Sequence, residues 1–292
     1  MFQHMLVALD GSESSLLAAG AAVELAALLQ ARLDILSVEE TSRRFMERDE
    51  EKEATEHAAA VNSLEQLQAP LLHHAKRRGV QASGRVVNGH AGQVILDYVR
   101  EERCDLLVLG HRGRSGAWGT FLGSTADKLV NHMPCSTLVI RSEVGKDLFK
   151  RLLVAFDGSA CSWQAFHVSL QLRKELDASI QLLYAIEDGY ALSASKIPST
   201  TSSQPTNWDR AHSVQFLQTL TEAERQWDER KDEIVVCQGS ASAVVTAIAY
   251  VKKVDLLVLG ATGRGDPASS TAGKTAQKVA NEALCSVLIV VR

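Results

Sequence analysis

Residues Leu106–Thr125 read LLVLGHRGRSGAWGTFLGST, and this stretch decides the fold. It starts with an apolar run that stops at Gly110, which predicts a buried strand because the run is too short for a helix. Gly110, Gly113 and Gly123 have the spacing G-x2-G-x9-G, and a helical pattern begins at Ser124. The stretch therefore predicts a strand, a glycine-rich loop and a helix, in that order.

The predicted loop suits the binding of an anion. A glycine can adopt a positive φ and expose its N–H without a side chain in the way, so the backbone is able to wrap a phosphate. A helix that begins at Ser124 adds unpaired N–H groups and the positive end of its dipole. Since long loops in compact domains are usually functional or disordered, we interpret this one as a phosphate loop.

Length and composition predict two globular domains. The chain has 292 residues, and 46% of them are hydrophobic, which is enough for two cores. A net charge of −4 and scattered Lys and Arg argue against a nucleic-acid surface. Five cysteines without a C-x-x-C pattern predict neither a disulfide framework nor a zinc site, and Cys135 and Cys285 are expected in apolar strands.

The start of the chain, MFQHMLVALDGS, runs directly into a predicted strand and lacks the features of a signal peptide. No apolar segment approaches the ~20 residues that are needed to span a bilayer. We therefore expect a cytoplasmic protein without a membrane partner.

Apolar runs alternate with helical patterns along the first half of the chain. This alternation is typical of right-handed βαβ units with a parallel sheet covered on both faces. The predicted strands are residues 5–10, 33–38, 82–87, 106–110 and 136–140.

The second half repeats the first. LLVAFDGSACS at Leu152–Ser162 matches MLVALDGSESS, so Asp157 stands for Asp10, and LLVLGATG places Gly260 at the position of Gly110. We predict one domain at residues 1–142 and a second at 150–292. The second copy carries an additional Ser/Thr/Pro-rich stretch, Tyr190–Asn207, which is expected to be a surface loop.

With both glycine loops, both early aspartates and the repeat, the sequence resembles the universal stress protein family in tandem form. The specific part of the resemblance is the signature G-x2-G-x9-G-S/T of the ATP-binding branch, which the first half matches fully. The resemblance implies an α/β fold of two doubly wound domains, each with a five-stranded parallel sheet in the order 3-2-1-4-5. It also implies ATP at the carboxyl ends of strands one and four, where strand order reverses.

The resemblance carries roles over by position. The backbone near Val38 is expected at the adenine, Asp10 at the ribose hydroxyls and the glycine loop at the sugar and phosphates, with Mg²⁺ accompanying the phosphates. The implied binding residues of the first half are Ala8, Leu9, Asp10, Val38, Leu109, Gly110, Arg112, Gly113, Gly123, Ser124 and Thr125.

The second half departs from the signature, because Lys274 occupies the Ser/Thr position. Its side chain either binds a phosphate as a cation or blocks the phosphate tail, so the ligand of this half stays open. The corresponding residues are Asp157, Ala185, Gly260, Gly263, Gly273, Lys274 and Thr275.

Other interpretations of these residues are weaker. ASSTAGKT lacks the first glycine of a Walker loop, since Ala268 takes that place. Asp10 and Asp157 are more simply ribose ligands or turn and cap residues than catalytic bases. His73, His74, His90, His111 and His132 have no metal-ligand spacing. We predict no catalytic residues and no metal ligands in the chain.

Three functions follow as hypotheses. The first is a regulatory stress-response module that senses ATP without rapid turnover. The second is a nucleotide-free module with vestigial sites that recognises a protein partner, and the third is a slow ATPase or phosphotransferase. The resemblance further implies that the domains pair through their last strands, Ser136–Ile140 and Ser286–Val291, and that two chains form a homodimer.

Overall fold

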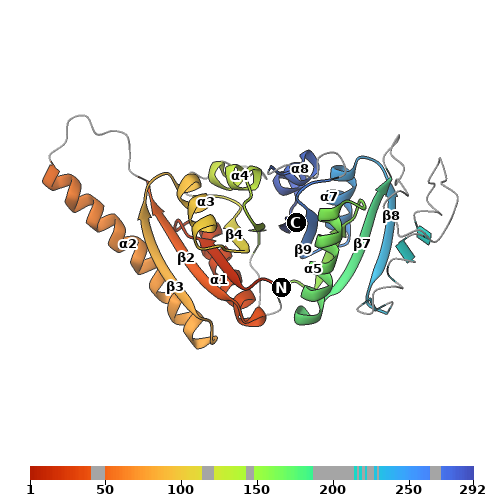
Figure 1. Ribbon diagram of the computed structural model, residues 1–292, viewed down its shortest axis with the longest axis horizontal. Coiled ribbons are helices and arrows are strands. Elements are labelled where there is room, and N and C mark those ends of the chain that lie inside the picture. Colours follow the sequence, from red (N-terminus) through yellow and green to blue (C-terminus); the bar gives the residue numbers. More distant parts are fainter. Residues whose placement is uncertain are drawn as a thin grey trace. The chain divides into compact units, whose positions relative to one another are not determined.

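Figure 1 shows the computed structural model of the protein, which contains two α/β units. The first unit is formed mainly by Met1–Leu148 and the second mainly by the residues from Phe149 onward. The described residues are 1–40, 50–113, 122–142, 148–186, 214–215, 217–218, 221, 227–228, 230–263 and 271–292. Residues 143–147 and 190–207 fall outside them, so the predicted domain boundaries and the surface loop stay predictions.

The predicted order of strands is confirmed in each repeat. The first sheet runs β3-β2-β1-β4-β5 and the second runs β8-β7-β6-β9-β10, with the paired strands parallel in every register that is recorded. The strands of the first repeat are β1 His4–Ala8, β2 Arg32–Glu39, β3 Ala82–Asn88, β4 Leu106–Gly110 and β5 Ser136–Ile140. Those of the second are β6 Arg151–Ala155, β7 Ser179–Ile186, β8 Glu233–Gln238, β9 Leu256–Gly260 and β10 Ser286–Val290.

Helices cover both faces of the sheet in the first repeat. Helix α1 packs against α2, and α3 packs against α4 on the other face (Figure 1). These helices are α1 Glu13–Leu29, α2 Glu50–Arg77, α3 Ala91–Glu101 and α4 Ser124–Asn131. The described helices of the second repeat are α5 Ala160–Leu176, α7 Ala241–Val251 and α8 Lys274–Glu282.

The apolar run that opens the glycine stretch forms the centre of the first core. Leu106, Leu107 and Val108 in β4 have no exposed surface, as expected for a strand with helices on both faces. The strand predicted at residues 5–10 is shorter than expected, because β1 ends at Ala8 and Asp10 lies in the following turn. Cys135 is buried and Cys285 is half-buried, and each lies one residue ahead of its strand, β5 or β10, so their predicted places within the apolar strands are wrong.

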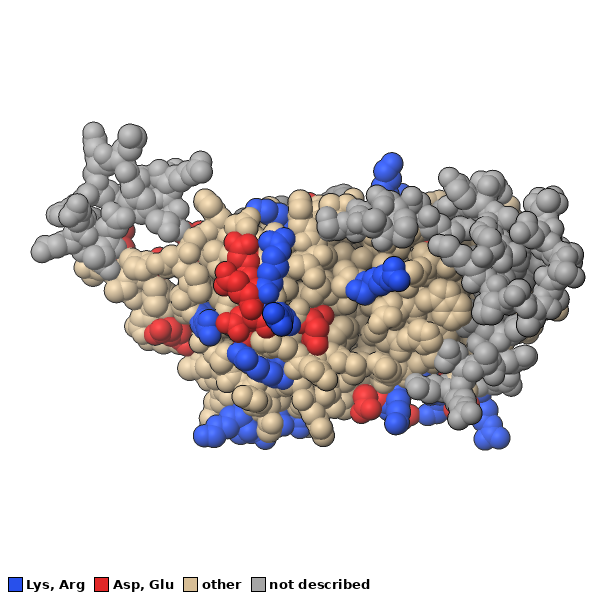
Figure 2. Space-filling view, in the orientation of Figure 1, with Lys and Arg blue, Asp and Glu red and all other residues tan. Residues whose placement is uncertain are grey.

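The surface fits the charge balance of the sequence. On the face drawn in Figure 2, Lys and Arg lie next to Asp and Glu and form no basic stripe among the residues that are described there. Among the described residues, no helix is both long and apolar enough to cross a membrane.

Candidate functional site

A cavity of about 300 Å³ opens where β1 and β4 end. The neighbours of β1 are β2 on one side and β4 on the other, so this is the point where the order of strands reverses. Ligands of doubly wound sheets bind at such a point. All eleven predicted residues of the first half line this cavity: Ala8, Leu9, Asp10, Val38, Leu109, Gly110, Arg112, Gly113, Gly123, Ser124 and Thr125.

Asp10 is oriented by the turn that follows β1. Its Oδ1 accepts the Ser12 N–H at 2.9 Å and the Ser12 hydroxyl at 2.6 Å. Gly11 between them has φ +82°, a conformation that favours glycine. Ser12 is the N-cap of α1 and accepts the Ser15 N–H at 3.2 Å, so of the two predicted cap residues Ser12 caps the helix and Asp10 makes the turn.

The first turn of α1 also holds the start of the glycine loop. Ser14 Oγ accepts the Arg112 N–H at 3.2 Å and lies 3.0 Å from His111 Nδ1. Ser12 Oγ lies 3.2 Å from the Arg112 carbonyl oxygen. The loop backbone is therefore fixed beside Asp10 by residues that the glycine signature does not contain.

Close approach excludes a side chain at Gly110 and leaves little space for one at Gly113 and Gly123. A Cβ at Gly110 would lie 2.6 Å from the backbone carbonyl group of Ser14, and one at Gly113 would lie 2.9 Å from Asp10 Oδ2. A Cβ at Gly123 would lie 3.2 Å from the Gly113 nitrogen. None of the three is among the described glycines with positive φ, so they do not use the left-handed conformation that glycine permits.

The other end of the loop presents the N-terminus of α4. Gly123 is the N-cap, with φ −63°, and it has no side chain to cap the helix. Gly123, Ser124, Thr125 and Ala126 line the cavity, so the positive end of the α4 dipole lies at its wall. This geometry favours an anionic group on the ligand.

Arg112 supplies the cationic side chain of the site. Its Nε is buried and has no hydrogen-bond partner among the described residues. A buried guanidinium donor without a partner is costly, and a phosphate oxygen is a suitable acceptor for it.

Five further residues line the cavity without having been predicted from the sequence. Helix α3 contributes Ala91 and Ile95. Glu40 also lines the cavity, and its Oε1 accepts the Ala91 N–H at 3.3 Å. Ser15 and Ala126 complete the set, each in the first turn of its helix. The periodic apolar positions of α3 could have predicted Ile95, whereas no motif marked the others.

The second repeat keeps the scaffold of the site. Asp157 Oδ1 accepts the Ser159 N–H at 2.9 Å, and Ser159 caps α5 through the Ser162 N–H. A Cβ at Gly260 would lie 2.6 Å from the backbone carbonyl carbon of Cys161, and one at Gly263 would lie 3.0 Å from Asp157 Oδ2. The same contacts therefore explain the turn and the first two glycines in both repeats.

The groups that would face a ligand differ. Thr262 stands in place of Arg112, Ala261 in place of His111, and the exposed Lys274 begins α8 with Thr275 after it. The space at Gly273 is wider, because a Cβ there would meet its nearest atom at 3.5 Å. Ala185 lies in β7 at the position that Val38 has in β2, so the second repeat has a smaller side chain there.

Comparison with known proteins places this geometry in a family. The model of the universal stress protein family matches residues 1–141 and again 148–291. Universal stress protein YxiE of Bacillus subtilis is 35% identical over 148 residues, which cover 48% of this chain and 100% of its own. Universal stress protein Rv1996 of Mycobacterium tuberculosis is 23% identical over 258 residues, which cover 84% of this chain and 78% of its own.

A solved structure agrees with the fold over almost the whole chain. The crystal structure of a universal stress protein from Archaeoglobus fulgidus has a TM-score of 0.73 at 16% identity, and the match covers 99% of this chain and 98% of that one. Two successive family matches, the repeated glycine loops and this shared architecture lead to one conclusion: the protein belongs to the universal stress protein family and carries two of its domains in tandem.

Proposed function

We propose that the first repeat binds ATP and that the protein is a regulatory stress-response module in which the nucleotide is sensed rather than rapidly turned over. The observation that carries this proposal is the cavity at the ends of β1 and β4, because its two ends differ in chemistry. Val38 and Ile95 are buried apolar residues at one part of the wall. Gly113, Gly123 and the start of α4 form another part that suits an anion.

The polar groups between these parts fit a nucleoside that carries several phosphates. Asp10 lies at the end of β1, and a carboxylate there is a suitable acceptor for ribose hydroxyls. Arg112 brings the buried guanidinium nitrogen that has no partner among the described residues. Mg²⁺ would accompany the phosphates and neutralise part of their charge.

A sensing role, without rapid turnover, is supported by the bonds that the two carboxylates lining the cavity already make. Glu40 Oε1 accepts the Ala91 N–H at 3.3 Å. Asp10 Oδ1 is bonded to the Ser12 N–H and hydroxyl, so the turn uses this oxygen. A general base must reach the proton that it abstracts. We therefore propose binding with a conformational readout, and the pairing of the domains and the homodimer stay predictions.

The test is to identify what the purified full-length protein carries and binds. Mass spectrometry of small molecules released on denaturation is expected to detect ATP or ADP. Equilibrium dialysis is expected to give saturable binding of Mg·ATP at one site, with phosphate release no faster than the buffer blank. Absence of binding at millimolar ATP would favour the nucleotide-free module, and steady phosphate release would favour the enzyme.

A further inference from the structure

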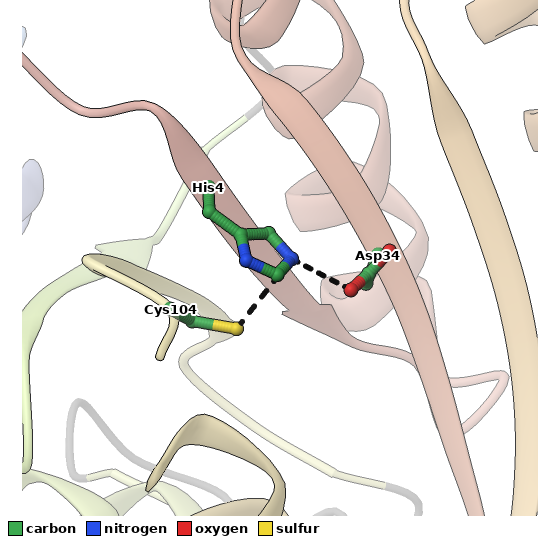
Figure 3. Close-up of side chains that lie close together, drawn as sticks. All are labelled: His4, Asp34 and Cys104. Carbon is green, nitrogen blue, oxygen red and sulfur yellow. Dashed lines mark hydrogen bonds and ion pairs between the residues drawn. The ribbon is translucent and has the colours of Figure 1, made fainter. Parts of the chain in front are cut away.

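Three side chains with metal-binding atoms meet at the amino ends of the strands in the first repeat, away from the cavity. His4 begins β1, Asp34 lies in β2, and Cys104 precedes β4, as Figure 3 shows. His4 Nε2 lies 2.7 Å from Asp34 Oδ2 and 3.9 Å from Cys104 Sγ. All three donor atoms lie within 4.8 Å of one another.

Burial removes these donors from water without sealing the cluster. Asp34 is 1% exposed and Cys104 is 5% exposed, while the His4 side chain is 16% exposed. An ion could therefore enter past His4, and a water molecule could occupy a remaining coordination position there.

Neighbouring groups hold Asp34 so that Oδ2 faces His4. Ser83 donates to Asp34 Oδ1 at 2.6 Å, and Arg32 donates to the same oxygen from Nη2 at 3.2 Å. Arg32 Nη2 also lies 3.1 Å from Oδ2, and the Tyr98 hydroxyl donates to Oδ2 at 3.2 Å. Ser83 and Arg32 hold Oδ1, so they could keep the carboxylate oriented when Oδ2 takes a metal in place of its present contacts.

The start of β1 is fixed as well. Asp105, next to Cys104 in the sequence, accepts the N–H groups of Gln3 at 2.7 Å and His4 at 3.1 Å. The backbone that carries His4 is thereby tied to the segment that carries Cys104.

The second repeat shows that the fold does not need this cluster. The same registers place Arg151 at the position of His4, Gln181 at that of Asp34 and Val254 at that of Cys104. Arg151 instead pairs with Asp255 at 2.7 Å. Because the second sheet forms without these three residues, the fold alone does not require them.

We propose that His4 Nε2, Asp34 Oδ2 and Cys104 Sγ form a binding site for Zn²⁺, with a water molecule as the fourth ligand. Nitrogen, carboxylate oxygen and thiolate are the ligands that zinc takes, and three protein ligands leave one position open. Zinc distances of about 2.0–2.3 Å place ligand atoms roughly 3–4 Å apart. The His4–Cys104 separation of 3.9 Å lies in this range, the His4–Asp34 separation of 2.7 Å is slightly shorter, and the Asp34–Cys104 separation is within 4.8 Å.

Zinc binding releases one proton from a neutral site. The Cys104 thiol gives its proton to solvent as the sulfur–zinc bond forms. His4 Nε2 donates to Asp34 Oδ2 in the structure, so a neutral imidazole has to transfer this proton through solvent to Nδ1 before Nε2 binds the metal. Burial, followed by the negative charges of Asp34, Glu102 and Asp105, raises the pKa of the Cys104 thiol to about 12, against the opposing charge of Arg32. Zinc has to displace this proton when it binds the sulfur.

The first experiment titrates Co²⁺, as a spectroscopic substitute for zinc, into chelator-treated full-length protein. We expect a thiolate-to-cobalt charge-transfer band that saturates at one equivalent and is abolished by Zn²⁺. Cys104→Ser should lose the band, whereas the matched controls Cys135→Ser and Cys161→Ser, each at another buried cysteine, should keep it. A band that survives in Cys104→Ser, or no band in the unaltered protein, contradicts the proposal.

A second measurement needs no variant and is independent of ATP binding. Zinc K-edge absorption of the unaltered protein with one equivalent of Zn²⁺ should show one sulfur ligand and otherwise nitrogen or oxygen. A shell without sulfur would mean that zinc binds elsewhere, for example at exposed histidines, and would overturn the assignment.

Discussion

The two repeats share the scaffold of the glycine loop but differ in the groups that the loop presents. Ser12 and Ser159 cap equivalent helices, and a Cβ at Gly110 or Gly260 would lie 2.6 Å from a helix backbone. By contrast, Arg112 corresponds to Thr262, whose hydroxyl lies 3.2 Å from Cys161 Sγ. Features common to both repeats are explained by the fold alone, so the evidence for a ligand comes from the features that differ.

The largest expected effect tests the shared part of this comparison. Gly110→Ala and Gly260→Ala each place a Cβ against helix backbone that cannot rotate away. We expect each to destabilise its own repeat by about 3 kcal/mol, the upper part of the range for overpacking. Urea unfolding should show similar losses in the free energy of unfolding for the two variants. A loss confined to Gly110→Ala would show that the two glycines have different structural roles.

A smaller effect should separate the repeats. Arg112→Thr gives the first loop the residue of the second, and it removes a cation from the wall of the cavity. Because hydrogen bonds to charged groups contribute about 1.5–3 kcal/mol, ATP affinity should fall at least tenfold. Calorimetric titration measures the fall, with Thr262→Ala as the control that should leave ATP affinity unchanged.

Removal of the N-cap hydroxyl should destabilise the two repeats equally. Ser12→Ala and Ser159→Ala each remove the side-chain acceptor of the first turn, at a typical cost of about 1 kcal/mol. Thermal unfolding of both variants checks this. Nearly equal losses of stability are expected. A loss several times larger in Ser12→Ala would mean that the contacts of Ser12 with Asp10 and Arg112 contribute more than the helix cap.

The smallest effect concerns pH. Burial, followed by the charges of Arg141 and Arg112, lowers the pKa of His111 below its ordinary value of 6.5. Since the folded pKa is the lower one, the stability that neutral His111 provides is present above about pH 6.5 and is lost as the pH falls through the folded value.

His111→Ala, which introduces the residue of the second repeat, should therefore weaken the loss of stability between pH 7.5 and pH 5.5. Urea unfolding at the two pH values measures it. The same loss in the variant and the unaltered protein would exclude His111 as the cause.

The sequence predicted the fold well because periodic apolar runs and their repetition determine a parallel sheet. It also predicted the positions of Asp10 and Gly110 at or near strand ends, and that of Gly123 at the start of a helix. The close approach of Ser14 and Asp10 to the glycines was not predicted, because it depends on packing between distant segments. His4, Asp34 and Cys104 were not grouped, since β pairing alone brings them together.

We propose that the first glycine loop forms an ATP site, whereas the ligand of the second loop stays open. Titration of Mg·ATP into Gly123→Val and Gly273→Val tests it directly, because each valine would fill the space beside one loop. We expect Gly123→Val to weaken binding by about 100-fold, a change of about 2.7 kcal/mol, while Gly273→Val stays close to the unaltered protein. Equal ATP affinity in both variants, or a loss in Gly273→Val alone, would contradict the account.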